Sequence, residues 1–360
     1  MESGERHPQF YFPDGDVILG ASLLRSLNGK VEKHQLYRVH KAHLAHYSVI
    51  FANMFADGNA ELGPKYDGQP LVELPDEADS LSRLFTYFYN PFEPLCTRWD
   101  PNAPILLSPV IRLADKYVVE GLRASLIKRV VSDWPCTLAA WDASEGEANA
   151  ILKHRVLSGT NTGRFVDQIP EPAAAIAFAR EFGCTEILPA AFYQLCRINI
   201  KEDFEHTDLS YLKYKRLARW SLLDLENITR YLHGREELRT YCKYIRRAFD
   251  EGEPLFYGCI PYWAFPDCPW VVPEQEKDRS ERPCYAFAER ILQLAWPENE
   301  ECDPLDGLLR LLDYESLPEV KKGHPKGFCE KCDWDFGEWI RRTRRGLWNR
   351  LPQLFQLSQS

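Results

Sequence analysis

The chain has 360 residues, 45% of them hydrophobic and 27% charged, and carries a net charge of −9 at pH 7. This length allows two or three domains with sizeable cores. A mildly acidic chain lacks the basic stripe of a nucleic-acid-binding protein, so we expect no nucleic-acid partner. No stretch approaches the ~20 consecutive apolar residues of a membrane span, so we expect no membrane partner either.

The cysteine content and the start of the chain indicate a cellular compartment. The first ten residues are polar and contain no apolar signal segment. The eleven cysteines are therefore expected in a reducing environment, as free thiols or metal ligands. We predict an intracellular protein, either cytoplasmic or nuclear.

The N-terminal third begins with strand patterns. Residues 16–19, after a Pro-Asp-Gly turn, and residues 36–39 are typical of strands, and the second runs into a helix. Ser48 is suited to cap a helix over residues 49–55. A third strand is predicted at residues 71–74.

Two helical stretches complete this region. Asp76 is placed to cap the first, whose apolar residues recur at helical spacing: Leu81, Leu84, Phe85 and Phe88. The second spans residues 105–131, and Gly121 is expected to break it. The order strand, strand, helix, strand, paired helices predicts a compact α+β module over residues 10–134.

The rest of the chain divides into three parts. Residues 135–172 contain the loop-like run Glu145-Gly146-Glu147 and are interpreted as a linker or insertion. Residues 173–250 predict an all-α helical bundle, in which Leu232-His233-Gly234 marks a helix end. Residues 251–360 predict an irregular Trp- and Cys-containing segment with short helices.

Several blocks of the first third resemble those of a BTB/POZ domain over residues 10–134. They are Gly15-Asp16-Val17, Tyr37-Arg38-Val39-His40-Lys41, Leu44 with Ser48 and Phe51, Val72-Glu73-Leu74-Pro75 and Leu113-Ala114-Asp115-Lys116-Tyr117. Later blocks resemble the C-terminal region of fungal, mostly basidiomycete, BTB-domain proteins. They are Ala190-Ala191-Phe192-Tyr193-Gln194-Leu195, Arg219-Trp220-Ser221-Leu222-Leu223, Gly234-Arg235-Glu236-Glu237-Leu238 and Trp348-Asn349-Arg350-Leu351-Pro352-Gln353-Leu354-Phe355.

The resemblance implies protein–protein association rather than enzymatic activity. It implies a homodimer formed through the BTB module, with the helical C-terminal region presented to an unknown partner protein. In BTB domains, residues matching Asp16 and His40 lie at a charged patch, so we expect these two to take part in interaction. An alternative is a substrate adaptor that binds a cullin-type ubiquitin-ligase scaffold. No kelch-like repeat follows, however, and the proline-rich residues 92–104 alter the expected cullin-facing edge.

A CxxC motif, Cys329-Glu330-Lys331-Cys332, predicts a metal site. Thiolates at this spacing can share one tetrahedral zinc ion. Two further cysteines lie in the preceding irregular segment, and Cys284 is nearby. We therefore predict a structural zinc clamp with four ligands: Cys259, Cys268, Cys329 and Cys332. The competing interpretation is a set of buried thiols, since cysteine packs as a small hydrophobic residue.

An enzyme that uses the CxxC as a thiol or metal centre is a third interpretation. It is disfavoured because no βαβ pattern surrounds the motif, and Lys331 is its one obvious basic neighbour. The acidic residues form no pattern that indicates a catalytic pair, so we predict that they lie on solvated faces. The sequence as a whole predicts a protein that is not an enzyme.

Overall fold

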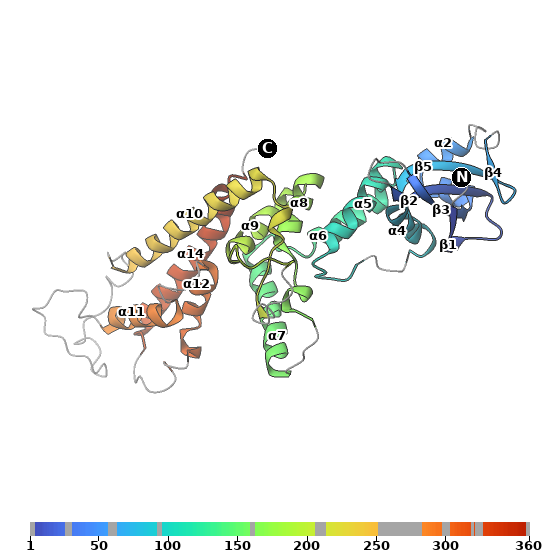
Figure 1. Cartoon of the computed structure of the whole chain (residues 1–360). Helices are drawn as coiled ribbons and strands as arrows, with labels where there is room; N and C mark the ends of the chain where they lie inside the picture. The colour runs from blue at the N-terminus through green and yellow to red at the C-terminus, as the bar shows by residue number, and fades with distance from the viewer. Residues whose placement is uncertain are drawn as a thin grey trace, which may run out of the picture. The chain divides into compact units, whose positions relative to one another are not determined.

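A computed structural model describes residues 4–25, 31–56, 63–91, 96–158, 163–205, 214–250, 283–296, 303–317, 320 and 327–357. The fold is mixed α+β, with a five-stranded sheet near the N-terminus and a helical remainder (Figure 1). This confirms the α+β class with a helical remainder that is expected from the sequence. The C-terminal segment, expected to be irregular with short helices, contains the 25-residue helix Glu330–Leu354. The chain divides into two compact units: unit 1 draws on residues 1–134 and 160–184, and unit 2 on residues 135–159 and 185–360.

The sheet of unit 1 has the strand order β1-β3-β2-β5-β4. The strands are β1 (Gly4–Tyr11), β2 (Val17–Arg25), β3 (Val31–Val39), β4 (Lys65–Tyr66) and β5 (Gln69–Glu77). Strand β2 pairs antiparallel with β3 and parallel with β5, while β1 pairs parallel with β3. The parallel β2–β5 pair is connected by helices, as parallel neighbours require a crossover.

The helices of unit 1 complete the module. They are α1 (Lys41–Tyr47), α2 (Val49–Ala56), α4 (Ala78–Tyr89), α5 (Ala103–Lys116), α6 (Glu120–Val131), the short η1 (Phe165–Gln168) and α8 (Pro172–Phe182). Helix α4 packs on β2 and β5, and α5 packs on α4, α6 and α8. The predicted stripe of α4 is buried throughout: Leu81, Leu84, Phe85 and Phe88 are at most 1% exposed.

Two predicted helix starts have different outcomes. The amide of Phe51 donates to Ser48 Oγ at 3.1 Å, so Ser48 caps α2 as predicted. The cap predicted for Asp76 is wrong, because α4 begins after Glu77. The Asp76 carboxylate instead accepts from Lys116 Nζ at 2.6 Å and from Tyr117 Oη at 2.5 Å. The carboxylate thus bonds to two donors about forty residues away, which the local sequence pattern does not reveal.

The break predicted at Gly121 lies three residues earlier. Val118 has a φ of 52°, the amide of Val119 donates to Ala114 O at 2.7 Å and that of Val118 to Asp115 O at 3.2 Å. This pair of bonds is a Schellman motif, which ends α5 with Val118 in the left-handed position that glycine usually occupies. Gly121 lies inside α6.

Unit 2 is helical among its described residues. Its elements are α7 (Leu138–Ser158), η2 (Thr185–Ile187), α9 (Leu188–Cys196), η4 (Trp220–Leu222), α10 (Leu225–Asp250), α11 (Pro283–Ala295), α12 (Pro304–Leu312), η8 (Tyr314–Ser316) and α14 (Glu330–Leu354). Helix α14 packs against α9, α10 and α12, and α11 packs against α12. Helices α10 and α14 run side by side in Figure 1.

Two loop-like patterns of the sequence lie within helices of unit 2. The run Glu145-Gly146-Glu147 is part of the 21-residue helix α7, and Leu232-His233-Gly234 is part of the continuous α10. A Cβ at Gly234 would lie 2.0 Å from the ring of Phe355. Gly234 thus admits an aromatic ring against the helix and does not end it. No helix in the described part of the chain is both long and apolar enough to span a bilayer.

Candidate functional site

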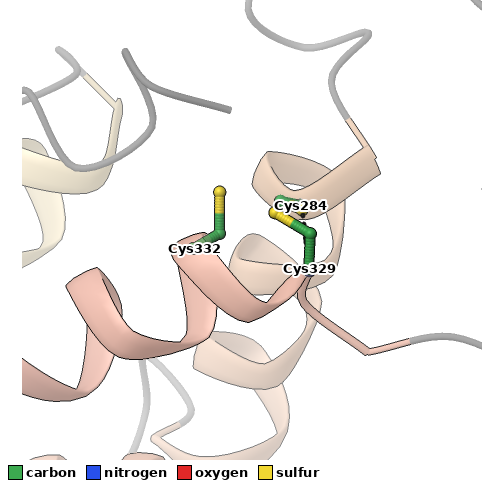
Figure 2. A group of neighbouring side chains, drawn as sticks. All are labelled: Cys284, Cys329 and Cys332. Carbon is green, nitrogen blue, oxygen red and sulfur yellow. Dashed lines mark hydrogen bonds between the residues drawn. The ribbon is translucent and has the colours of Figure 1, made fainter. Parts of the chain in front are cut away.

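Three cysteine side chains meet in unit 2. Cys284, Cys329 and Cys332 have sulfur atoms within 4.8 Å of one another, and no other group of metal-ligating side chains was found among the described residues. Figure 2 shows Cys329 and Cys332 at the beginning of α14 and Cys284 on the neighbouring helix. None of the three forms a disulfide. Thiolates at this separation can hold a metal ion, because zinc–sulfur bonds of about 2.3 Å in tetrahedral geometry place sulfur atoms about 3.8 Å apart.

Local structure brings the three residues together. Pro283 opens α11, which places Cys284 in its first turn. Cys329 is the residue that precedes the first turn of α14, and Cys332 lies within that turn. The amide of Cys329 donates to Cys284 Sγ at 3.4 Å, which joins the two helix starts. A backbone N–H directed at sulfur favours its charged form, and that is the form which binds metals.

Three aromatic rings belong to the same apolar core as the cysteine group. Phe287, Tyr314 and Phe328 contact one another edge to face, with centroid distances between 4.9 and 5.6 Å. Tyr314 Oη donates to Asp333 Oδ1 at 3.0 Å. Burial, followed by this hydrogen bond, raises the pKa of Tyr314. Apolar surroundings of this kind lower the local dielectric constant and so strengthen the attraction between thiolates and a cation.

The predicted four-cysteine clamp is only partly within the described structure. Cys329 and Cys332 lie together, whereas Cys259 and Cys268 lie outside the described residues. The third member of the observed group is Cys284, which the sequence placed nearby but not among the ligands. A signal for it was available: it directly follows a proline that can open a helix, and it precedes an apolar helical pattern.

Asp16 and His40, the predicted interaction residues, lie at the turn between β1 and β2 and at the start of α1. Asp16 is exposed, and its Oδ1 accepts from the amide of Lys41 at 2.7 Å. His40 is half-buried, with Nε2 3.3 Å from Asp14 Oδ1 and its amide donating to Tyr89 Oη at 3.1 Å. Burial is the main cause that raises the pKa of Tyr89 to about 12. The two residues thus lie close together, since Asp16 bonds to the residue that follows His40.

A second polar cluster in unit 2 has no counterpart in the sequence analysis. Arg197 Nη2 donates to Glu145 Oε2 at 2.7 Å, and Arg197 Nε lies 2.5 Å from Asp303 Oδ2. Arg216 Nη2 donates to Glu145 Oε1 at 3.1 Å, and Tyr193 Oη donates to Asp303 Oδ1 at 2.7 Å. The prediction that acidic residues lie on solvated faces is therefore wrong for Glu145 and Asp303.

Burial in this cluster shifts the pKa values of two of its members. Burial, together with the nearby charge of Arg197, lowers the pKa of Arg216 to about 10. Burial, together with the charge of Asp303, raises the pKa of Asp306. The groups of the cluster are paired with one another, which suits a structural role in joining α7, α9 and α12 rather than the binding of a substrate.

No family model, curated protein or solved structure matches this chain.

Proposed function

We propose that this protein is a non-enzymatic interaction protein of the BTB/POZ type, which forms a homodimer through unit 1 and presents its helical C-terminal region to a partner protein. The observation that carries the proposal is the composition of α2. Its eight residues include no charged side chain, and Phe51 alone is buried. Val49 is 60% exposed and Ile50 36% exposed.

The order of elements supports the assignment of unit 1. Gly15-Asp16-Val17 lies at the start of β2, and Tyr37 to Lys41 spans the end of β3 and the start of α1. Val72 to Pro75 lies in β5, and Leu113 to Lys116 closes α5. The blocks that resemble a BTB/POZ domain thus fall on the strand, strand, helix, strand and paired helices that the sequence patterns predict.

Residues of these blocks also hold α2 in place. Ser48 Oγ donates to the carbonyl of Tyr117 at 2.6 Å. The rings of Phe51 and Tyr117 stack with a centroid distance of 4.4 Å and an interplanar angle of 6°. One side of α2 is therefore fixed to the turn between α5 and α6, while Val49 and Ile50 remain on the other side. A fixed, uncharged face is a suitable surface for association.

A second copy of the chain is the occupant that this face suits best. In an isologous dimer the same patch covers itself across a twofold axis. The α2 face offers no charge with which to select a different partner of complementary charge, but an apolar face is complementary to itself. Burial of such side chains stabilises association by roughly 25 cal/mol for each Å² of apolar surface removed from water.

Analytical ultracentrifugation of the full chain tests the homodimer. We expect wild-type protein to sediment as a dimer at micromolar concentration, and the V49D/I50D double variant as a monomer. Aspartate in the first turn of a helix favours the helix, so these changes should leave α2 folded. Ile105, which is 41% exposed on α5, gives a matched control, and I105D should remain dimeric. A wild-type monomer, or an equal effect of I105D, would contradict the proposal.

Binding of a cullin scaffold would add one partner to this function. Asp16 and His40 mark a charged patch of unit 1 at which such a partner could be recognised, and D16N tests that role. A pull-down with a recombinant fungal cullin distinguishes an adaptor, which is retained, from a dimeric interaction protein without this partner. D16N should reduce any retention and leave the sedimentation of the dimer unchanged, since the patch and α2 are separate features.

We further propose that the cysteine group of unit 2 holds a structural zinc ion, in an intracellular protein that stays in the cytoplasm or nucleus. The specific observation is the convergence of three sulfur atoms within 4.8 Å, together with the amide of Cys329 directed at Cys284. Soft thiolates favour zinc over harder cations such as magnesium. Zinc takes four ligands, and structural zinc sites usually take all four from the protein. The three cysteines supply three of them, and Cys259 and Cys268, which lie outside the described residues, are the candidates for the fourth.

Metal analysis of the purified full chain tests the zinc site. We expect about one zinc ion per chain, as a tetrahedral thiolate site binds one ion, and loss of that ion in C284S and C332S. Cys242 is buried in the same apolar core but lies outside the cysteine group, so C242S should keep its zinc. Zinc that leaves only as α11 and α14 lose amide protection marks a structural ion. A CxxC that cycles between thiol and disulfide without metal would favour an enzyme instead.

A further inference from the structure

The three cysteines differ in their access to solvent. Cys284 is 6% exposed and Cys332 is fully buried, whereas Cys329 is half-buried at the start of α14. Figure 2 shows Cys329 where the chain enters the helix, with Cys332 further along it. A small solvent-borne reagent therefore reaches the sulfur of Cys329 first. Access and thiolate character together decide which cysteine is oxidised.

We propose that Cys329 is a peroxide-sensitive modification site, and that its oxidation to a disulfide with Cys284 releases the metal. The inference rests on the proposed zinc site, because zinc binding deprotonates its thiol ligands and so supplies the reactive thiolate. The oxidant is a hydroperoxide, of which hydrogen peroxide is the simplest. The metal-bound and disulfide forms are then two states of one site.

Cys284 is the partner that the geometry favours. Its sulfur accepts the amide hydrogen of Cys329 at 3.4 Å, so it already lies against the backbone of the oxidised residue. It also comes from the first turn of a different helix, α11. A disulfide needs a sulfur–sulfur distance of about 2.05 Å. The sulfur atoms of Cys284 and Cys329 lie within 4.8 Å of each other, so a small movement can bring them to bonding distance. Cys332 is fully buried, which makes it the less accessible of the two.

The reaction balances in two steps. The Cys329 thiolate attacks one oxygen of hydrogen peroxide, the O–O bond breaks, and hydroxide leaves to take up a proton as water. This leaves a sulfenic acid on Cys329. The Cys284 thiolate then attacks that sulfur, the S–O bond breaks, and a second hydroxide leaves as water. Two thiolates have lost two electrons in all and peroxide has been reduced to two waters. Of the three thiolates in the cysteine group, only Cys332 then remains available to zinc.

The disulfide preserves the connection that the metal made. Zinc held by three thiolates joins the first turn of α11 to the start of α14, and a Cys284–Cys329 disulfide joins the same two points. The oxidised protein should therefore remain folded around α11 and α14, while the ligands that held zinc are consumed. This distinguishes a reversible switch from oxidative damage, which would expose the apolar core around Phe336 and Ile340.

Zinc release from the full chain tests the inference. Protein that carries zinc as purified is treated with hydrogen peroxide in the presence of a zinc-binding dye. We expect release of essentially all of the zinc, a disulfide between Cys284 and Cys329 in peptide mapping by mass spectrometry, and recovery of zinc binding after dithiothreitol and added zinc. Cys136 is an exposed thiol, and C136S should release zinc to the same extent as wild type.

The outcomes separate this inference from the zinc proposal. Protein that contains no zinc contradicts the zinc proposal itself. Protein that keeps its zinc while peroxide oxidises Cys136 contradicts the switch and leaves the structural zinc in place. A disulfide mapped between Cys329 and Cys332 overturns the choice of Cys284. Dimedone added together with peroxide to the zinc-loaded wild-type chain should trap the sulfenic acid on Cys329; an adduct on Cys284 or Cys332 instead contradicts the mechanism.

Discussion

The two units of the chain handle their charged groups differently. In unit 1 most of the described ion pairs lie at the surface, as between Arg6 and Asp67, and the interior between sheet and helices is filled by aliphatic and aromatic side chains. Where an acidic side chain of unit 1 is at most 9% exposed, as in Asp76 and Asp133, its ion pair is with a partly exposed cation. In unit 2 an arginine, Arg197, lies among carboxylates from two other segments with a side chain only 13% exposed. The first unit is stabilised by apolar burial, and the second adds a buried ionic cluster.

This difference teaches which features a sequence pattern can reveal. Apolar burial follows the period of a helix or strand, so it is visible in one segment at a time. A buried ion pair joins segments that are far apart in sequence, and each partner alone is indistinguishable from a solvated residue. Breaking such a pair leaves an uncompensated buried charge, which costs more than the intact pair contributes.

The largest loss of stability is expected when the Arg197 side chain is removed. The R197A variant removes the cation paired with Asp303 and leaves Glu145 with Arg216 as its partner. We expect the free energy of unfolding of unit 2 to fall by about 3–5 kcal/mol, the usual cost of breaking a buried pair. Hydrogen exchange measured by mass spectrometry should show the loss of amide protection in α7, α9 and α12, while β2 in unit 1 serves as an internal reference.

A matched arginine on the surface provides the control. Arg239 pairs with Glu236 across 3.8 Å on α10, and both side chains are more than half exposed. Pairs of this kind contribute about 0–1 kcal/mol, so R239A should leave the exchange pattern almost unchanged. Equal effects of R197A and R239A would mean that the ionic cluster does not stabilise unit 2, and the contrast between the units would disappear.

The second largest loss of stability is expected when the Tyr117 hydroxyl of unit 1 is removed. Tyr117 Oη donates to Asp76 Oδ2 at 2.5 Å, and burial, then this bond, raises the pKa of Tyr117. Y117F should destabilise unit 1 by about 1.5–3 kcal/mol, the range for a hydrogen bond to a charged group. Tyr11 makes the same bond to Asp67 at 2.5 Å in an exposed position, so Y11F should cost clearly less in the same urea titration.

The elements of unit 1 were largely predictable because their determinants are local. The spacing of Leu81, Leu84, Phe85 and Phe88 defines the buried side of α4 without reference to the rest of the chain. Ser48 caps α2 through an amide three residues away. Asp76 was misinterpreted because a residue suited to a cap can equally accept from Lys116 and Tyr117, forty residues distant.

The candidate site of unit 2 was half predictable for the same reason. Cys329 and Cys332 are close in sequence, so the spacing of the motif already indicates shared coordination. Their third neighbour, Cys284, is 45 residues away. The proline before it indicates a helix start, but does not show which other cysteines that helix start will meet. Glu145 was assigned to a loop because Gly146 follows it, yet α7 continues through both residues. Contacts between segments far apart in the sequence therefore decide which cysteine joins the group and whether residues 145 and 146 are helical.

The third prediction tests the end of α5. Val118 adopts a φ of 52°, a conformation that is strained for a β-branched residue and costs about 1–3 kcal/mol. Glycine adopts it freely but loses about 0.5–1 kcal/mol of backbone entropy on folding. V118G should therefore stabilise unit 1 by about 1 kcal/mol, the difference between these two costs, measured as a shift of the urea midpoint.

The end of helix α8 in the same unit allows the opposite substitution, of a glycine by valine at a positive φ. The helix ends with Gly183 at a φ of 76°, and the amide of Cys184 donates to Ala179 O at 3.0 Å, as in the end of α5. G183V should destabilise unit 1 by an amount similar to the gain from V118G. Gly121 has no neighbouring atom in the way of a Cβ, so G121A should be stabilising. A destabilising G121A would restore Gly121 as the break between α5 and α6.

The smallest expected effect is a dependence of the stability of unit 1 on pH, caused by His7. His7 Nδ1 accepts from the amides of Gln9 at 3.2 Å and Phe10 at 3.0 Å, and its ring stacks on Phe10 and Tyr37. Burial lowers the pKa of His7 below its ordinary value of 6.5. The neutral ring is the form that accepts these bonds, so its contribution is complete above pH 6.5 and is lost as the pH falls through the lowered pKa.

Asparagine at position 7 should remove this pH dependence and keep the fold. Its side-chain oxygen can accept from the amides two and three residues later, as in an Asx turn, and it does not titrate. We therefore expect H7N to match wild type at pH 7.5 and to exceed its stability at pH 5, with the two urea midpoints separating as the pH falls. Because the imidazole is partly exposed, the separation should be smaller than the shift in V118G. Parallel pH profiles would mean that the bonds of Nδ1 contribute nothing to β1, and that apolar burial alone stabilises the edge of the sheet.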